Sequence, residues 1–150
     1  MRVMIINGPN MNLLGLREPE MYGYKTYDDL EAETLRHAGE LGVEVEFVQS
    51  NHEGDLVDAI QQAYFDFYDG IILNPAGYTH TSVAIGDALA AVPVPCVEVH
   101  VSPVDSREEF RRINFVRDKV IATVSGEGIE GYNHALDILV RHVEESEENQ

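Results

Sequence analysis

In Gly70–Ser82, GIILNPAGYTHTS, an unbroken apolar run passes directly into a polar segment. A strand with one solvated face would alternate apolar and polar residues, and this run does not. A short continuous apolar run is typical of a central strand in a parallel sheet that helices cover on both faces. We therefore predict an interior parallel strand, followed by a polar segment at the carboxyl end of the sheet, where open α/β sheets bind ligands.

The rest of the chain repeats this pattern. Other apolar runs of strand length are VMII at 3–6, VEVEFV at 43–48, CVEVHV at 96–101 and VIATV at 120–124. The stretches between them predict helices at Tyr27–Leu41, Gly54–Phe65, Ser82–Ala91 and Ile129–Glu145, with a short helical turn at Arg107–Phe110. The regular alternation predicts an α/β fold: a flavodoxin-like, doubly wound, five-stranded parallel sheet of order 2-1-3-4-5 in a three-layer α-β-α sandwich.

Local signals support two of these elements. Thr26 is a candidate N-cap for the first helix, with Asp29 three residues on, and Gly42 is the candidate stop. The run at 43–48 alternates valine or phenylalanine with glutamate, so we expect one of its faces to be solvated. That pattern indicates a strand at the edge of the sheet.

Length and composition limit the class of protein. The chain has 150 residues, so we expect a single catalytic domain over residues 1–150, with a flexible acidic tail at about 145–150. Its single cysteine, Cys96, cannot form an intramolecular disulfide, and without a secretory or membrane-spanning apolar run we expect a cytoplasmic location. The net charge of −17 argues against nucleic acid or a membrane as a partner. The sequence leaves open whether the acidic surface reflects a high-salt habitat.

Polar side chains follow every predicted strand. In a parallel sheet these segments share one end, so their side chains become candidates for one crevice: Asn7, Asn10, Asn51, His52, Asn74, His80, His100 and Ser102. Each residue alone would be read as ordinary turn chemistry, because asparagine and glycine suit turns. Their convergence on one end of the sheet favours a ligand site.

Two familiar ligand motifs fit this set poorly. Gly126, Gly128 and Gly131 match a dinucleotide fingerprint in spacing, but they follow the last strand, and Glu127 would repel a pyrophosphate. The loop histidines at 52, 80 and 100 lie on separate loops without the i, i+4 spacing of a helical zinc site. We expect no metal and no cofactor.

Glu98 and His100 are two residues apart in a predicted strand and therefore point the same way, so the carboxylate can orient the imidazole. Arg107, Arg111 and Arg112 follow shortly afterwards, although they would also suit a helix stabilised by ion pairs. These residues predict a cofactor-free acid–base site for a small anionic ligand.

A long connection precedes the first helix. Roughly 20 residues separate the first strand from that helix, beyond ordinary loop length, and they include LREPEMYGY at 16–24. This length predicts a lid that closes over the ligand. Tyr24, next to the helix, is assigned to packing only.

Five segments closely resemble the type II 3-dehydroquinate dehydratases: INGPNMNLLGLREPEMYG at 6–23, QSNHEG at 49–54, NPAGYTHTSVAIGDAL at 74–89, VEVHVSPVDSREEFR at 97–111 and GEGIEGYNHAL at 126–136. The resemblance implies a hydro-lyase that removes water from 3-dehydroquinate by anti elimination, through an enolate, to give 3-dehydroshikimate. It also implies a homo-oligomer, a dodecamer built from trimers, which uses no metal, cofactor or Schiff-base lysine. Whether the reaction serves aromatic biosynthesis by the shikimate pathway or quinate breakdown is left open.

The resemblance assigns catalytic roles position by position. Tyr22 matches the base, Arg17 in the same loop matches the group that activates it, and Arg107 lies nearby. His100 matches the general acid, oriented by Glu98.

It assigns binding roles as well: Asn10 holds a water against the enolate oxygen, while Asn74 and the backbone N–H groups of Val101 and Ser102 anchor the substrate carboxylate. The ring hydroxyls are bound by His80 and Arg111, and Asp87 reaches the site of a neighbouring subunit. Where many members have arginine before that aspartate, this chain has Gly86, so the subunit contacts can differ.

Two alternatives from other classes remain at this stage. One is a non-enzymatic, flavodoxin-like binding or signalling module, in which the loops only fold or hold a ligand. The other is a metal-dependent hydrolase that uses the loop histidines, which predicts stoichiometric zinc.

Overall fold

The protein is a five-stranded parallel sheet with helices on both faces, as described by a computed structural model that covers residues 1–16 and 24–150. The strand order β2-β1-β3-β4-β5 confirms the predicted topology. The strands are β1 (Arg2–Asn7), β2 (Glu44–Gln49), β3 (Gly70–Asn74), β4 (Cys96–His100) and β5 (Ala122–Ser125). Strand β2 lies at the edge, as its alternating sequence predicts.

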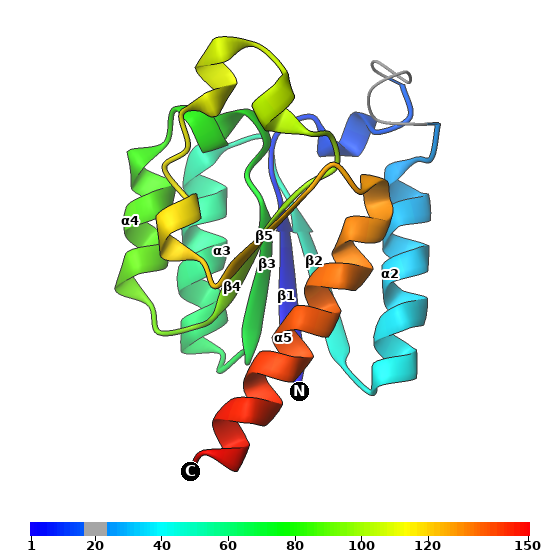
Figure 1. The fold of residues 1–150 in the computed structure, drawn as a ribbon, viewed down its shortest axis with the longest axis vertical. Coiled ribbons are helices and arrows are strands. Elements are labelled where there is room, and N and C mark those ends of the chain that lie inside the picture. The colour runs from blue at the N-terminus through cyan, green and yellow to red at the C-terminus, as the bar shows by residue number, and fades with distance from the viewer. Residues whose placement is uncertain (17–23) are drawn as a thin grey trace.

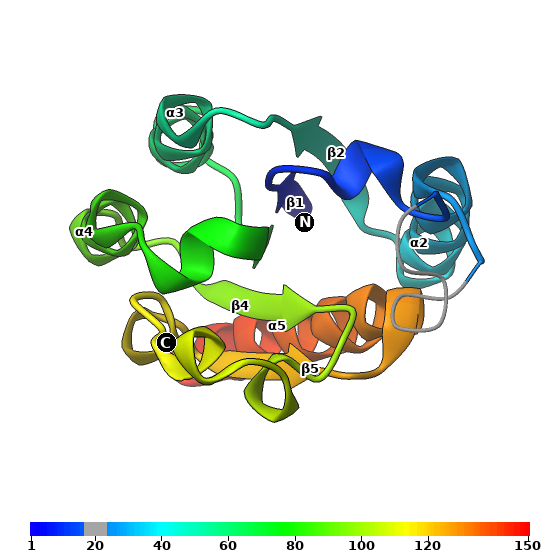
Figure 2. The ribbon, with the colours of Figure 1, turned by 90° about the horizontal axis from the view of Figure 1, so that it is seen from above.

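The helices pack as two pairs: α2 (Tyr27–Leu41) and α5 (Gly131–Glu148) cover one face of the sheet, and α3 (Glu53–Phe65) and α4 (Val83–Ala91) cover the other (Figures 1 and 2). The α2 bounds match the prediction. Helix α5 continues to Glu148 instead of ending at Glu145, so most of the acidic tail is helical. The predicted turn at Arg107–Phe110 is wrong in position, because the 3₁₀ turn there spans Glu109–Arg112.

The ends of α2 follow from its capping residues. Thr26 accepts a hydrogen bond from the Asp29 backbone N–H, and the Asp29 carboxylate accepts one from the Thr26 N–H, which completes a capping box. Gly42 ends the helix with a φ of 71°, a conformation that glycine adopts without steric cost. Tyr24 does not pack as predicted, because 80% of its surface is exposed.

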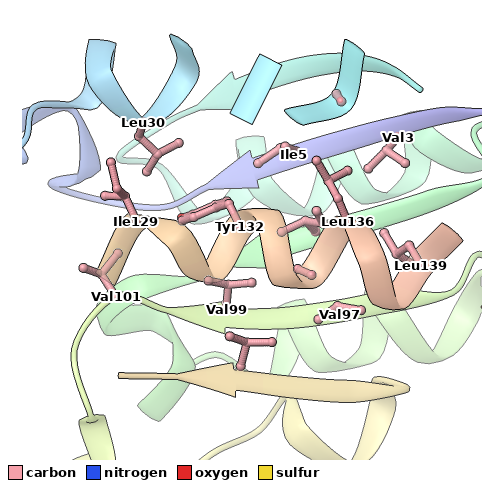
Figure 3. Packing of buried hydrophobic residues seen from close by; sticks show 14 of the residues in the cluster. Val3, Ile5, Leu30, Val97, Val99, Val101, Ile129, Tyr132, Leu136 and Leu139 are labelled. Atoms are coloured by element: carbon pink, nitrogen blue, oxygen red, sulfur yellow. The ribbon is translucent and has the colours of Figure 1, made fainter. Parts of the chain in front are cut away.

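The sheet separates two apolar cores because successive side chains point to opposite faces. On β1, Val3 and Ile5 pack toward α2 and α5, while Met4 and Ile6 pack toward α3 and α4. Strand β3 divides its residues in the same way, which explains why its apolar run is continuous. Figure 3 shows the first core, where α5 lies over the central strands.

The loops that follow β1 and β3 are held together at the carboxyl end of the sheet. The Gly8 N–H donates to the Asn74 carbonyl oxygen at 2.8 Å. A Cβ at residue 8 would lie only 2.6 Å from the Pro75 carbonyl oxygen, so this close approach requires glycine. This contact joins the two loops at the carboxyl ends of β1 and β3.

Among the described residues, no helix combines the length and apolar character that crossing a membrane would need.

Candidate active site

A cavity of about 150 Å³ lies at the carboxyl ends of the strands. Its walls come from segments 9–14, 74–80, 100–104 and 107–111, which follow β1, β3 and β4. This is the ligand position expected for a doubly wound sheet.

Most of the predicted site residues line this cavity. The residues that line it are Asn10, Asn74, His80, His100, Val101, Ser102, Arg107 and Arg111. Asp87 does not line the cavity of its own chain, because it lies on the exposed face of α4. Arg17 and Tyr22, the predicted activating residue and base, lie outside the described residues.

Asn10 enters the site from a strained turn. It has a φ of 69°, a left-handed conformation that asparagine tolerates better than most residues. The Asn10 backbone N–H donates a hydrogen bond to the Asn51 side-chain oxygen at 3.0 Å, which joins this turn to the loop after β2. Ala76, which also lines the cavity, has a positive φ of 52°. Backbone held in this region is common at binding sites.

His100 and Glu98 form a buried pair on β4. The His100 Nε2 lies 2.5 Å from Glu98 Oε2, and their side chains are 3% and 0% exposed. Because a carboxylate only accepts hydrogen bonds, Nε2 carries the proton, and Nδ1 remains to exchange a proton with a ligand. The sequence predicted this orientation from the two-residue spacing.

Glu98 has further partners that the sequence did not indicate. Asn114 Nδ2 donates to its Oε2 at 2.7 Å, and Thr123 Oγ1 donates to its Oε1 at 2.9 Å. Arg117 Nε lies 3.7 Å from Oε1. Burial would raise the pKa of Glu98, but the bonds from His100, Asn114 and Thr123 outweigh it and hold the pKa below the ordinary value. The carboxylate therefore stays ionised at neutral pH.

His80 is fixed as a neutral hydrogen-bond acceptor. Its Nδ1 lies 2.7 Å from the Ile113 carbonyl oxygen, so Nδ1 is the protonated nitrogen and Nε2 carries a lone pair. Burial lowers the pKa of His80, although its bond to Ile113 opposes that shift. At neutral pH this ring can accept a hydrogen bond from a ligand hydroxyl.

Two arginines give the cavity its positive charge. Arg111 Nε donates to Glu108 Oε2 at 2.5 Å, which holds its guanidinium in place. The Arg107 side chain is only 8% exposed, and its Nε lies 3.9 Å from Glu108 Oε2. Both side chains line the cavity, so it suits an anionic ligand despite the acidic surface of the molecule.

The third loop histidine lies apart from these two. His52 is exposed at the start of α3 and does not line the cavity. In the part of the chain that the structure describes, no three histidine, cysteine or acidic side chains are grouped so that they could hold a metal ion. The arrangement required by a histidine-based metal hydrolase is therefore not formed by His52, His80 and His100.

Fold and site together define a doubly wound α/β protein with an acid–base pair beside cationic side chains in its crevice. The chain belongs to the class II dehydroquinase family, since the family model described as Dehydroquinase class II matches residues 1–140.

Curated relatives and solved structures agree with this family. The chain is 50% identical to catabolic 3-dehydroquinase 1 of Fusarium vanettenii over 94% of this chain and 97% of the relative. It is also 50% identical to a 3-dehydroquinate dehydratase of Caldicellulosiruptor bescii over 92% and 95% of the two chains. The crystal structure of a type II dehydroquinase from Butyrivibrio crossotus superposes with a TM-score of 0.92 at 45% identity, covering 93% of this chain and 97% of that one.

Proposed function

We propose that this protein is a type II 3-dehydroquinate dehydratase, which eliminates water from 3-dehydroquinate to give 3-dehydroshikimate. The observation that carries the proposal is the buried Glu98–His100 pair, which borders a cavity with Asn74, Arg107 and Arg111 in its walls. A proton donor and cations beside one small cavity suit a carboxylate-bearing substrate that loses a hydroxyl group. Membership of the family and the names of its relatives agree with that reaction.

The first step removes a proton from the carbon beside the ketone, and Tyr22 is its base. A free tyrosine has a pKa of about 10, so only about one part in a thousand is phenolate at pH 7, a penalty of about 4 kcal/mol. A guanidinium within about 4–6 Å favours the phenolate and does not itself lose a proton. Arg17 and Arg107 supply that charge, and Asn10 holds a water against the enolate oxygen.

The second step expels the hydroxyl group. Doubly protonated His100 gives its Nδ1 proton to the leaving oxygen, which departs as water while the enolate electrons form the new carbon–carbon double bond. The Glu98 carboxylate accepts the hydrogen bond from Nε2, and its negative charge stabilises the imidazolium before the transfer. Neither step uses a metal or a cofactor.

The substrate is held at its carboxylate and its ring hydroxyls. Asn74 and the backbone N–H groups of Val101 and Ser102 bind the carboxylate, while His80 and Arg111 bind hydroxyls. Asp87 is exposed on α4, so it is available to a neighbouring subunit, as a trimer-based dodecamer requires. We place the enzyme in the cytoplasm.

The test is an ultraviolet assay for the conjugated enone formed from 3-dehydroquinate. Wild-type protein and the His52→Ala control should form the enone at similar rates, while His100→Ala should be slower by about 10²–10⁴-fold, the usual contribution of a general acid. Treatment with a chelator should not change the rate. No enone from the wild type would leave both the binding module and the metal hydrolase as alternatives. Loss of enone formation in His52→Ala or with the chelator would show that the dehydration itself depends on a metal, against the proposed mechanism.

A further inference from the structure

A chain of buried hydrogen bonds runs behind the cavity wall, from the carboxylate anchor to the start of α2. Asn74 Nδ2 donates to the Tyr132 hydroxyl at 3.1 Å, and the Tyr132 hydroxyl donates to Asn7 Oδ1 at 2.5 Å. Asn7 Nδ2 then donates to the Tyr27 hydroxyl at 3.2 Å. Asn7 and Tyr132 are fully buried and Asn74 is 3% exposed, so these polar groups depend on one another for partners.

The direction of each bond is set by its neighbours. Ala76 N–H donates to Asn74 Oδ1 at 3.0 Å, and a backbone N–H can only donate, so the amide nitrogen of Asn74 must face Tyr132. The Tyr132 oxygen therefore accepts from Asn74, and its one proton goes to Asn7. Burial raises the pKa of Tyr132, so the hydroxyl keeps that proton at physiological pH.

This arrangement leaves one Asn74 N–H facing the cavity. Its present contact is the Met11 sulfur at 3.4 Å, a weak acceptor in the cavity wall. A carboxylate oxygen is a far stronger acceptor and would replace that contact. If the amide were rotated by half a turn, its oxygen would face the carboxylate and repel it.

We propose that Tyr132 is a positioning residue for substrate binding, because its hydroxyl holds the Asn74 amide with an N–H toward the substrate carboxylate. This inference rests on the proposed function, in which Asn74 binds that carboxylate. Tyr132 lies on α5, a helix that contributes no residue to the cavity lining, and its ring packs in the core between α5 and the sheet (Figure 3). Its contribution to the reaction is therefore indirect.

The experiment is steady-state kinetics of Tyr132→Phe, which keeps the buried ring and removes the hydroxyl. We expect KM for 3-dehydroquinate to rise about tenfold, the usual scale for losing one hydrogen bond to a charged group, while kcat changes less than about threefold. The matched control is Tyr68→Phe, since Tyr68 is also buried and its hydroxyl donates to Glu46, away from the cavity lining. Tyr68→Phe should lower the unfolding temperature and leave KM unchanged.

A double-mutant cycle separates positioning from general loosening of the core. If Tyr132 acts through Asn74, adding Tyr132→Phe to Asn74→Ala raises KM no further. If the two substitutions multiply each other's increase in KM, or if Tyr132→Phe leaves KM unchanged, the inference is overturned while the proposed function stands. An inactive wild type would overturn the proposed function itself.

One measurement on the wild type does not depend on either variant folding. The Asn74 side-chain amide protons, followed by NMR without substrate, should exchange slowly with solvent because one of them is bonded inside the core. Rapid exchange of both protons would contradict the inference, whatever the enzyme kinetics show.

Discussion

At the scale of single residues, the acid–base chemistry depends on a charge that the fold has removed from water. Glu98 is fully buried, and an ionised carboxylate in that position needs partners to offset the loss of hydration. His100, Asn114 and Thr123 supply them with hydrogen bonds of 2.5–2.9 Å. The imidazole is therefore held in one tautomer before any substrate arrives.

The low pKa of Glu98 predicts how stability responds to acid. The pKa of Glu98 is lower in the folded protein than in the unfolded chain. Its ionisation therefore stabilises the fold above about pH 4.3, the ordinary glutamate pKa. This stabilisation is lost as the pH falls from that value through the pKa of the folded state. Urea unfolding should show that the free-energy difference between wild type and Glu98→Gln shrinks from pH 7 toward pH 3. An unchanged difference across that range would mean that Glu98 is not ionised in the fold.

His100→Ala should separate the two chemical steps. Without the general acid, proton abstraction still occurs while the hydroxyl group leaves slowly, so recovered substrate should exchange the hydrogen beside the ketone with solvent deuterium. Mass spectrometry of unreacted 3-dehydroquinate in D₂O measures this exchange. Dehydration at the wild-type rate would exclude His100 as the acid.

Residues within one strand could be predicted from the sequence, and their distant partners could not. Glu98 and His100 were found because a strand repeats every two residues. Asn114 and Thr123 come from other segments, and only the β4–β5 register and the turn after Arg112 bring them to Glu98. Tyr132 could not be predicted as a site residue, because a tyrosine on a helix facing the core looks like ordinary packing.

At the scale of elements, the contact between α4 and segment 113–117 accounts for the unusual Gly86. A Cβ at this position would clash with the Phe115 carbonyl oxygen. Phe115 is held there because its backbone N–H donates to the Thr79 carbonyl oxygen at 3.0 Å. Many family members have arginine at this position, and the sequence alone suggested that glycine here changes the subunit contacts. The close contact with Phe115 explains the glycine within a single chain. Only a glycine lets the segment lie this close to the helix.

Gly86→Ala should destabilise the protein by about 1–3 kcal/mol, the usual cost of overpacking a buried site. The matched control is Gly39→Ala in the exposed part of α2, where a Cβ has open space. Alanine should raise the free energy of unfolding there by about 0.5–1 kcal/mol. Denaturant unfolding measures both changes. Equal effects of the two substitutions would contradict the close contact at Gly86.

The regular elements were more predictable than the short turns. Strands and long helices have periodic patterns that span many residues, and the strand order follows from their alternation. The turn predicted at Arg107–Phe110 was displaced because a single 3₁₀ turn has no periodic pattern. The sequence therefore could not predict the geometry of segment 107–112, which carries the cavity arginines Arg107 and Arg111.

At the scale of the whole molecule, the net negative charge destabilises the fold, while the arginines of the cavity attract an anionic ligand. The chain carries 27 acidic and 10 basic residues, a net charge of −17, and this self-repulsion destabilises the compact state. The substrate is also an anion, so Arg107 and Arg111 must reverse the field locally.

Added salt should therefore stabilise the protein. Raising NaCl from about 0.01 to 0.5 M shortens the Debye length from about 30 Å to less than 8 Å, which screens most repulsion between surface carboxylates. Circular dichroism should show the unfolding temperature rising over this range, and rising equally in KCl if screening is the cause. A constant or falling temperature would show that surface repulsion does not limit stability.

If this fold dehydrates 3-dehydroquinate with Tyr22 as the base, removing the Tyr22 hydroxyl must slow the reaction without unfolding the protein. Enone formation is compared for wild type and Tyr22→Phe, each checked for native structure by circular dichroism. We predict steady enone formation by the wild type and a loss of turnover of at least about 10²-fold in Tyr22→Phe, the lower range for removing a general base. A folded Tyr22→Phe variant with near-normal turnover would contradict the mechanism, and a folded wild type that forms no enone would contradict the function.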